Sequence, residues 1–155
     1  PGGPHHGFCP NQPFDCYSIS KLNVEGLSGA GSQYIIEMDE DFKISVDLYF
    51  PAPGMAPNAL TKLILCKGIN LDATFAVEGF GPAPELNLPA ATVRSSKGVY
   101  NYTLMYTGKT PRQAGLEPGV YKVAGVVTVN TNDPCEVGPL GFGYISDVIF
   151  QVYKA

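Results

Sequence analysis

Three potential metal ligands lie close together near the N-terminus, in the segment PGGPHHGFCPNQPFDC. His5 and His6 are adjacent, and Cys9 follows them closely. Imidazole nitrogens and a thiolate are suitable ligands for copper or zinc. The same segment is rich in Pro and Gly and lacks apolar periodicity, which is typical of an irregular segment. We therefore expect residues 1–16 to form an N-terminal arm, and copper or zinc binding is one hypothesis for its role.

Four carboxylates form a second cluster, because Glu37, Asp39, Glu40 and Asp41 lie between two predicted strands. A bound calcium ion needs several oxygen ligands, and such a turn can supply some of them. The spacing does not match an EF-hand loop. A solvated turn is therefore the simpler interpretation of this cluster.

Motifs for catalysis are incomplete. The segment GLSGAG at residues 26–31 differs by one position from the nucleophile elbow G-x-S-x-G, and no helical pattern follows it. The Gly-Phe-Gly segments at 79–81 and 141–143 lack the downstream helix of a dinucleotide-binding turn. His5 and His6 are the two histidines of the chain, so a nucleophile elsewhere has no histidine base in its own domain. The sequence predicts neither an enzyme nor a cofactor.

Cys9, Cys16, Cys66 and Cys135 are an even number of cysteines, without the close C-x-x-C spacing that zinc sites usually show. We expect them to form disulfides, as in proteins of an oxidising compartment, with free thiols as the alternative. Four cysteines allow three pairings, and the sequence does not choose among them.

Two further features favour export. The tripeptide Asn101-Tyr102-Thr103 matches the N-glycosylation pattern, which makes Asn101 a glycosylation candidate if the source is a eukaryote. The chain begins with Pro1 instead of Met, which suggests that an upstream segment was removed, although a chosen chain boundary would look the same. We expect a secreted protein or one on the extracellular surface.

Length and composition limit the possible classes. The 155 residues suit a single domain. Charged residues make up 15 %, below the roughly 25 % usual for soluble domains. The net charge is −4 and the ten Lys and Arg form no basic run, so nucleic acid is not an expected partner. No apolar run approaches the roughly 20 residues of a membrane-spanning helix, so no transmembrane segment is predicted.

Apolar and polar residues alternate along most of the chain after residue 16, and this period of two predicts β-strands. The inward faces of the clearest strands are Phe42, Ile44, Val46, Leu48 and Phe50; Leu71, Ala73, Phe75 and Val77; and Tyr121, Val123, Gly125, Val127 and Val129. Weaker strands are expected over 17–24, 33–37, 60–66 and 91–94. No stretch of a dozen residues shows a helical period, so we predict an all-β fold, an antiparallel two-sheet sandwich over residues 17–155.

Two late segments are more apolar than a half-exposed strand requires. The outer face of residues 121–130 is itself partly apolar, which indicates a central strand or a covered face. In GFGYISDVIFQVY, we expect Tyr144, Val148, Phe150 and Val152 on one side of a strand, with Ile145, Asp147, Ile149 and Gln151 on the other.

Three tyrosines fall on one face of another predicted strand. Tyr100, Tyr102 and Tyr106 alternate with polar residues in YNYTLMY. A tyrosine has an apolar ring and a polar tip, so this face suits either core packing or a contact surface.

The segment Leu116-x-Pro118-Gly119-x-Tyr121-x-Val123 resembles the turn and tyrosine corner of immunoglobulin-like sandwiches. The resemblance covers about 40 residues and implies a fold, with Pro118, Gly119 and Tyr121 as structural residues. It implies that the Tyr121 hydroxyl bonds to backbone between residues 115 and 118. Val123 stands where an antibody domain has its second cysteine and the chain has no Trp, so an antibody-type domain is disfavoured.

The order of FDCYSISKLNVEG, GVYNYTLMYTG and LEPGVYKV, followed by Cys135, is similar to that of ML-type lipid-binding domains. This second resemblance implies a Cys16–Cys135 disulfide and a lipid slot between the sheets. The middle cysteine pair of that family is not matched, and 20 residues follow Cys135.

These observations leave three hypotheses for function. The leading one is a binding or structural subunit of an extracellular assembly, with a protein partner or a second copy of the chain. In that case the arm at residues 1–16 can add to a neighbour's sheet edge. The alternatives are a carrier of lipid or another small hydrophobic ligand, and metal binding by the arm.

Overall fold

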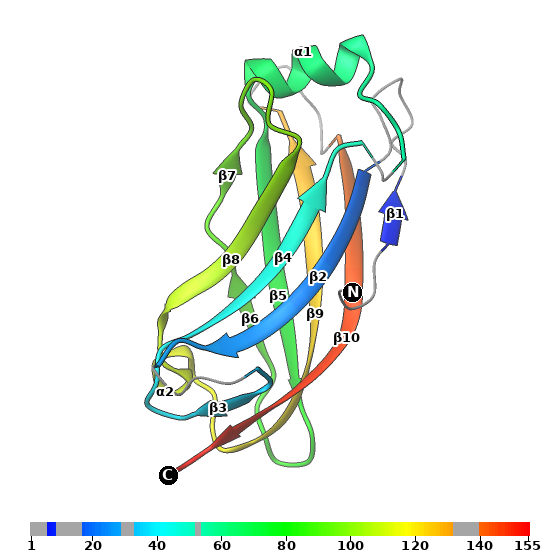
Figure 1. Cartoon of the computed structure of the whole chain (residues 1–155). Coiled ribbons are helices and arrows are strands. Elements are labelled where there is room, and N and C mark those ends of the chain that lie inside the picture. The colour runs from blue at the N-terminus through cyan, green and yellow to red at the C-terminus, as the bar shows by residue number, and fades with distance from the viewer. Residues whose placement is uncertain (1–5, 9–16, 29–32, 52–53, 132–139) are drawn as a thin grey trace.

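The computed structural model describes residues 6–8, 17–28, 33–51, 54–131 and 140–155 (Figure 1). These residues form ten strands in two sheets and two helices. The four-stranded sheet has the order β1 (His6–Phe8), β2 (Tyr17–Gly26), β4 (Phe42–Tyr49) and β8 (Asn101–Lys109).

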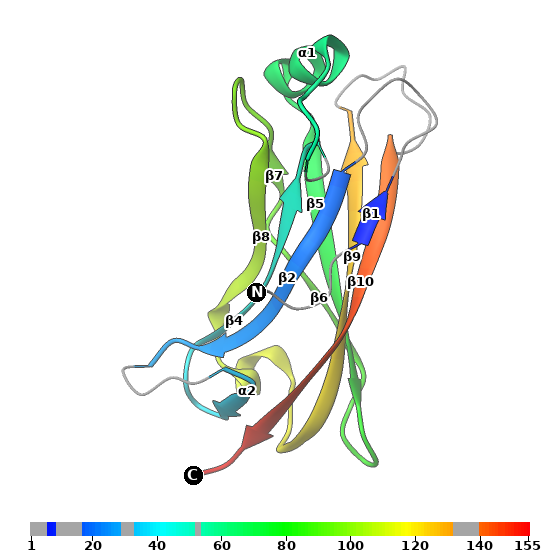
Figure 2. The same cartoon turned by 45° about the vertical axis from the view of Figure 1, so that its right-hand side comes forward.

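The six-stranded sheet contains the longest strands of the described part. Its order is β3 (Ile35–Glu37), β10 (Gly141–Tyr153), β9 (Gly119–Asn130), β5 (Asn70–Gly79) and β6 (Leu86–Pro89), and β7 (Val93–Arg94) also pairs with β5. Strand β9 is therefore central, which accounts for its apolar composition. Figure 2 shows β9 and β10 running along the same side of the molecule.

Pairing among the described strands is antiparallel with one exception. Strand β3 runs parallel to β10, with Ile36 opposite Val152. The prediction of an antiparallel fold is correct for the other pairs and wrong here. Residues 33–37 were expected as a weak strand, but alternation within a strand carries no information about the direction of its partner.

Both sheets contribute to one hydrophobic core. The residues predicted to face inward on β4, β5 and β9 are buried, with Phe42, Phe75 and Tyr121 fully so. The rings of Tyr17 and Phe50 also contact each other in this core, with centroids 5.3 Å apart. Alternation therefore predicted the core face correctly in strands that have one buried face and no extra residue of their own.

Strand β10 changes face part-way along its length. Its pairing with β9 shifts between Ile145 and Val148, which indicates a bulge. Ile145 is buried before the bulge, and Val148 and Phe150 are buried after it. An extra residue at a bulge inverts the alternation. The expectation that Tyr144 lies on the same side of the strand as Val148 is therefore wrong, since Val148 is buried and Tyr144 is 57 % exposed.

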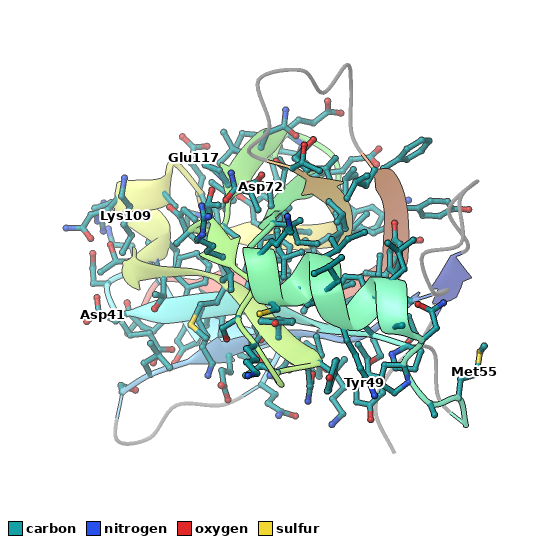
Figure 3. The ribbon with its side chains drawn as sticks, turned by 90° about the horizontal axis from the view of Figure 1, so that it is seen from above. Asp41, Tyr49, Met55, Asp72, Lys109 and Glu117 are labelled. Atoms are coloured by element: carbon teal, nitrogen blue, oxygen red, sulfur yellow. The ribbon has the colours of Figure 1, made fainter. Side chains whose placement is uncertain are left out.

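Residues 60–66 were expected as a strand but lie in helix α1 (Ala59–Lys67). The Asn58 side chain caps the helix by accepting a hydrogen bond from the Thr61 amide at 2.8 Å. Gly68 ends it with a φ of 90°, a conformation that favours glycine. Thr61 and Leu65 are buried on one helix face. Figure 3 shows α1 lying across one end of the molecule.

The turn before β9 contains the tyrosine corner that the sequence predicted. Helix α2 (Pro111–Ala114) leads into this turn. The Tyr121 hydroxyl donates a hydrogen bond to the carbonyl oxygen of Glu117, within the expected segment. The Tyr121 ring is fully buried and stacks on Phe150, with centroids 5.4 Å apart. Pro118 is exposed in the turn and Gly119 begins β9.

Replacing Tyr121 with phenylalanine is expected to lower the free energy of unfolding by about 1 kcal/mol, because the Glu117 carbonyl loses its donor. Urea unfolding of the parent and the variant measures the difference. Self-association of the folded variant should match that of the parent, since the ring stays in place. A variant with normal stability but altered self-association would show that Tyr121 belongs to a binding site and does not only stabilise the fold.

Candidate binding surface

The outer face of the six-stranded sheet is built from rows of residues that lie opposite one another. Tyr144 on β10 lies opposite Val126 on β9, and Val126 lies opposite Thr74 on β5. Further along, Phe142 lies opposite Thr128. Because alternate residues of a strand share a face, these side chains lie on the solvent side of the sheet.

Three of these outward side chains, and Ile149 of β10, which lies opposite Lys122, are large, apolar and exposed. We call them the apolar strip: Val126, Phe142, Tyr144 and Ile149, which are 42, 68, 57 and 55 % exposed. The bulge of β10 changes which residues face outward, so Phe142 and Tyr144 face outward before it and Ile149 faces outward after it, opposite Lys122. Two neighbouring strands thus present aromatic and aliphatic surface together.

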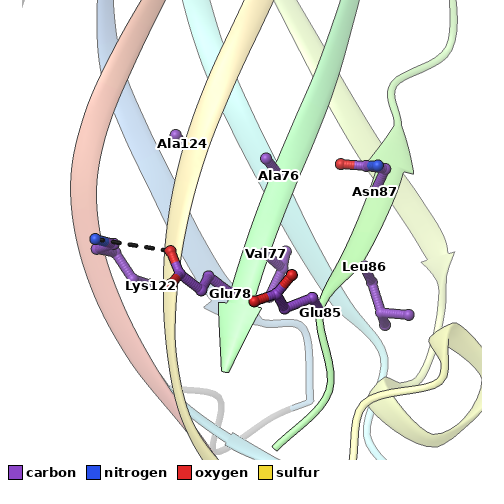
Figure 4. Close-up of a pocket in the computed structure, with 8 residues that line it drawn as sticks. All are labelled: Ala76, Val77, Glu78, Glu85, Leu86, Asn87, Lys122 and Ala124. Atoms are coloured by element: carbon purple, nitrogen blue, oxygen red, sulfur yellow. Dashed lines mark ion pairs between the residues drawn. The ribbon is translucent and has the colours of Figure 1, made fainter. Parts of the chain in front are cut away.

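A depression adjoins the strip between β9, β5 and β6 (Figure 4). Ala76 and Ala124 lie opposite each other in its floor, and their short side chains leave a volume of about 650 Å³. Lys122 and Glu78 also line the depression, and their charged groups are 3.8 Å apart. Glu85 is a third charged residue of its lining. The Glu78–Lys122 pair is largely exposed, so it contributes little to stability and its charges remain accessible to a partner.

This combination of an apolar strip with a charged end is suited to binding another macromolecule. It contains no histidine and no cysteine among its described residues. The chain matches no family model, and its comparison with curated proteins and with solved structures also gives no match. The function must therefore be inferred from the chemistry of this surface.

Sequence analysis identified only part of this surface. It indicated that the outer face of residues 121–130 is partly apolar, but it placed Tyr144 on the same side of the strand as Val148, which is buried. A usable signal was the alternation of Gly141 and Gly143 with Phe142 and Tyr144. A β-carbon at Gly141 would lie 2.9 Å from the Tyr17 hydroxyl oxygen, so an aromatic ring of the other sheet occupies the glycine side.

The three tyrosines of residues 100–106 are placed mainly in the core. Tyr102 and Tyr106 are buried, and Tyr100 packs against the same core from a partly buried position. The Tyr102 hydroxyl donates to the Val99 carbonyl and accepts from the Ser96 amide. Burial raises the pKa of Tyr102 and of Tyr106. Core packing therefore describes these side chains better than an exposed contact surface.

The acidic cluster forms a hydrogen-bonded turn. Asp39 pairs with Arg112 of α2 at 2.7 Å, and this hydrogen bond lowers the pKa of Asp39. Glu40 accepts from the Glu37 amide at 2.8 Å and from the Ser28 hydroxyl at 2.6 Å. Among the described residues, no group of three or more His, Cys, Asp and Glu is arranged to hold a metal ion.

Predictions that concern the N-terminal arm and the disulfides fall mostly outside the described residues. These include His5, Cys9, Cys16 and Cys135, so metal binding and disulfide pairing stay predictions. Within the described part, Cys66 is an exposed free thiol on α1.

Part of the arm is described and is not irregular. Residues 6–8, which include His6, form β1 and pair antiparallel with β2 of the same chain. Asn101, the glycosylation candidate, is exposed at the start of β8. No described helix has the length and apolar character to cross a membrane.

Proposed function

We propose that this chain is a binding and assembly subunit of a secreted or surface structure, an immunoglobulin-like β-sandwich that associates with a second copy through the apolar strip. The exposure of the four strip residues on the outer face of one sheet carries the proposal. Contiguous exposed apolar surface marks interaction sites on soluble proteins. The tyrosine corner and the two sheets with a common core support the immunoglobulin-like assignment.

The energetics favour contact between the strips of two copies. Burying a large apolar side chain contributes about 1.5–3 kcal/mol, so four per copy form a substantial interface core. Aromatic residues such as Phe142 and Tyr144 are enriched at such interfaces. Sheets also pack readily face to face through apolar side chains.

Charge next to the strip favours a second copy as the occupant. A twofold interface uses the same patch on both copies and must therefore be self-complementary. The patch carries both signs, because Lys122 lies beside Glu78 and Glu85 at its lower end. Opposite charges of two copies can thus meet around the strip, as complementarity requires.

Replacing Phe142 with serine is expected to weaken self-association at least about tenfold, because the most exposed ring of the strip is removed. Sedimentation velocity over a range of protein concentrations measures the dissociation constant. Leu63→Ser is the matched control, since Leu63 is 52 % exposed on α1 and is not part of the strip, so its loss should not change self-association. A parent that is monomeric at all concentrations, or equal effects of both variants, would contradict the proposal.

The other two hypotheses gain no support from the described residues. The pockets described here open on the outer faces of the sheets, whereas a lipid carrier needs a cavity between them. The metal-binding hypothesis rests on an arm whose ligands lie mainly outside the described residues.

A further inference from the structure

A polar groove lies on the outer face of the four-stranded sheet. Cross-strand rows form it: Tyr49 on β4 lies between Ser18 and Asn101, and the next row places Asp47 between Ser20 and Thr103. Two adjoining depressions of about 390 and 380 Å³ share Lys21 and Asp47. We call the joined depressions the polar groove and define it by Ser20, Lys21, Asn23, Asp47, Tyr49 and Asn101.

The polar groove and the apolar strip face away from each other. Figure 3, seen from above, shows Tyr49 on one side of α1 and Asp72, from the outer face of the six-stranded sheet, on the opposite side. A ligand in the polar groove therefore leaves the apolar strip uncovered.

The backbone is distorted where the groove is formed. Lys21 and Tyr34 are the non-glycine residues with positive φ in the described part of the chain, at 55° and 67°, and both line the groove. The β2–β4 pairing also shifts between Ser20 and Asn23, which indicates a bulge at Lys21. Such a bulge redirects a side chain, and strained residues concentrate at functional sites. Here the distortion places Lys21 beside Asp47, at 3.8 Å.

Charges in the groove balance. Lys21 pairs with Asp47, and Lys43 pairs with Glu25 at 2.9 Å. Two ammonium groups and two carboxylates leave the groove without net charge. It therefore attracts neither a cation nor an anion such as a phosphate.

The remaining lining supplies hydrogen-bonding groups of both kinds. The amides of Asn23 and Asn101 each donate and accept, and so does the Ser20 hydroxyl. Tyr49, which is 40 % exposed, adds an aromatic ring at one end of the groove.

We propose that the polar groove binds a neutral saccharide. A saccharide carries closely spaced hydroxyl groups that donate and accept at once, and it has apolar C–H faces that can lie on a tyrosine ring. Asp47 and Asn101 contact the hydroxyl groups, and Tyr49 packs against the ring of the sugar. A lipid chain would leave these polar groups without partners, which is unfavourable.

Titration of the ¹⁵N-labelled full chain tests the proposal, with cellohexaose, chitohexaose, mannohexaose and xylohexaose as probes. The protein is made in bacteria, so that Asn101 carries no glycan. We expect saturable amide shifts along β2, β4 and β8 with at least one probe. Tyr49→Ala and Asn101→Ala should each weaken its binding at least about tenfold, whereas Tyr49→Phe should retain it because the ring remains.

Phe142→Ser is the control on the opposite sheet and should bind the saccharide as the parent does, whether or not it alters self-association. The proposal is overturned if none of the four probes gives saturable shifts. It is also overturned if the groove variants bind as tightly as the parent, or if oligogalacturonate, an acidic probe, binds more tightly than the neutral ones.

Discussion

Replacing Phe75 with alanine is expected to lower the free energy of unfolding by about 3–5 kcal/mol, the largest effect we expect of any substitution considered. Phe75 is fully buried at the middle of β5 and lies opposite Gly125 on central β9. A β-carbon at Gly125 would lie 3.6 Å from the Phe75 ring, so the ring fills the space that glycine leaves. The variant therefore loses buried apolar area and gains a cavity between two central strands.

Urea unfolding at 25 °C measures this change, with Phe142→Ala as the control. Phe142 is 68 % exposed, so the same chemical change there should cost far less. Phe75→Leu should recover part of the loss, because leucine refills part of the cavity. Similar losses for Phe75→Ala and Phe142→Ala would contradict the core described here.

Raising the pH above about 10 is expected to destabilise the fold, because burial raises the pKa of Tyr17 to about 12. Tyrosine in the unfolded chain has a pKa near 10, so between these values the unfolded state releases a proton that the folded state keeps. The stability that the buried neutral hydroxyl contributes is fully present below about pH 10 and is lost as the pH rises through about 12.

Three other tyrosines act in the same direction, since burial also raises the pKa of Tyr102, Tyr106 and Tyr121. Urea midpoints between about pH 8 and pH 12 measure the combined dependence. Tyr17→Phe should flatten it, because phenylalanine cannot ionise in either state. If the parent and Tyr17→Phe lose stability with the same slope, the alkaline sensitivity has another origin.

The core faces of β4, β5 and β9 could be predicted because the extra residue of each bulge lies on a partner strand. The inward residues of these three strands, such as Phe42, Phe75 and Tyr121, therefore recur at every second position without interruption. The tyrosine corner was equally accessible, because its hydrogen bond to Glu117 spans only four residues. The alternation of apolar residues and the short sequence distance between Tyr121 and Glu117 were sufficient to predict these features.

Helix α1, the parallel β3–β10 pair and the exposure of Tyr144 could not be predicted in the same way. Helix α1 is defined by the cap at Asn58 and by Gly68, because its nine residues are too few to show a clear period. The direction of β3 depends on a strand more than a hundred residues later in the chain. Tyr144 was misplaced because a bulge, which alternation does not reveal, separates it from Val148. The candidate surface was missed for the same reason, since half of the apolar strip lies on that side of the bulge.

The central position of β9 also affects how the chain can fold while a ribosome is making it. Strand β5, at residues 70–79, is synthesised well before its main partner β9, at residues 119–130. During that interval β5 can pair only with the short strands β6 and β7. Its apolar residues then lack their long neighbouring strand β9, and unpaired apolar strands are prone to aggregate. We therefore expect the nascent chain to depend on chaperone protection until β9 has emerged.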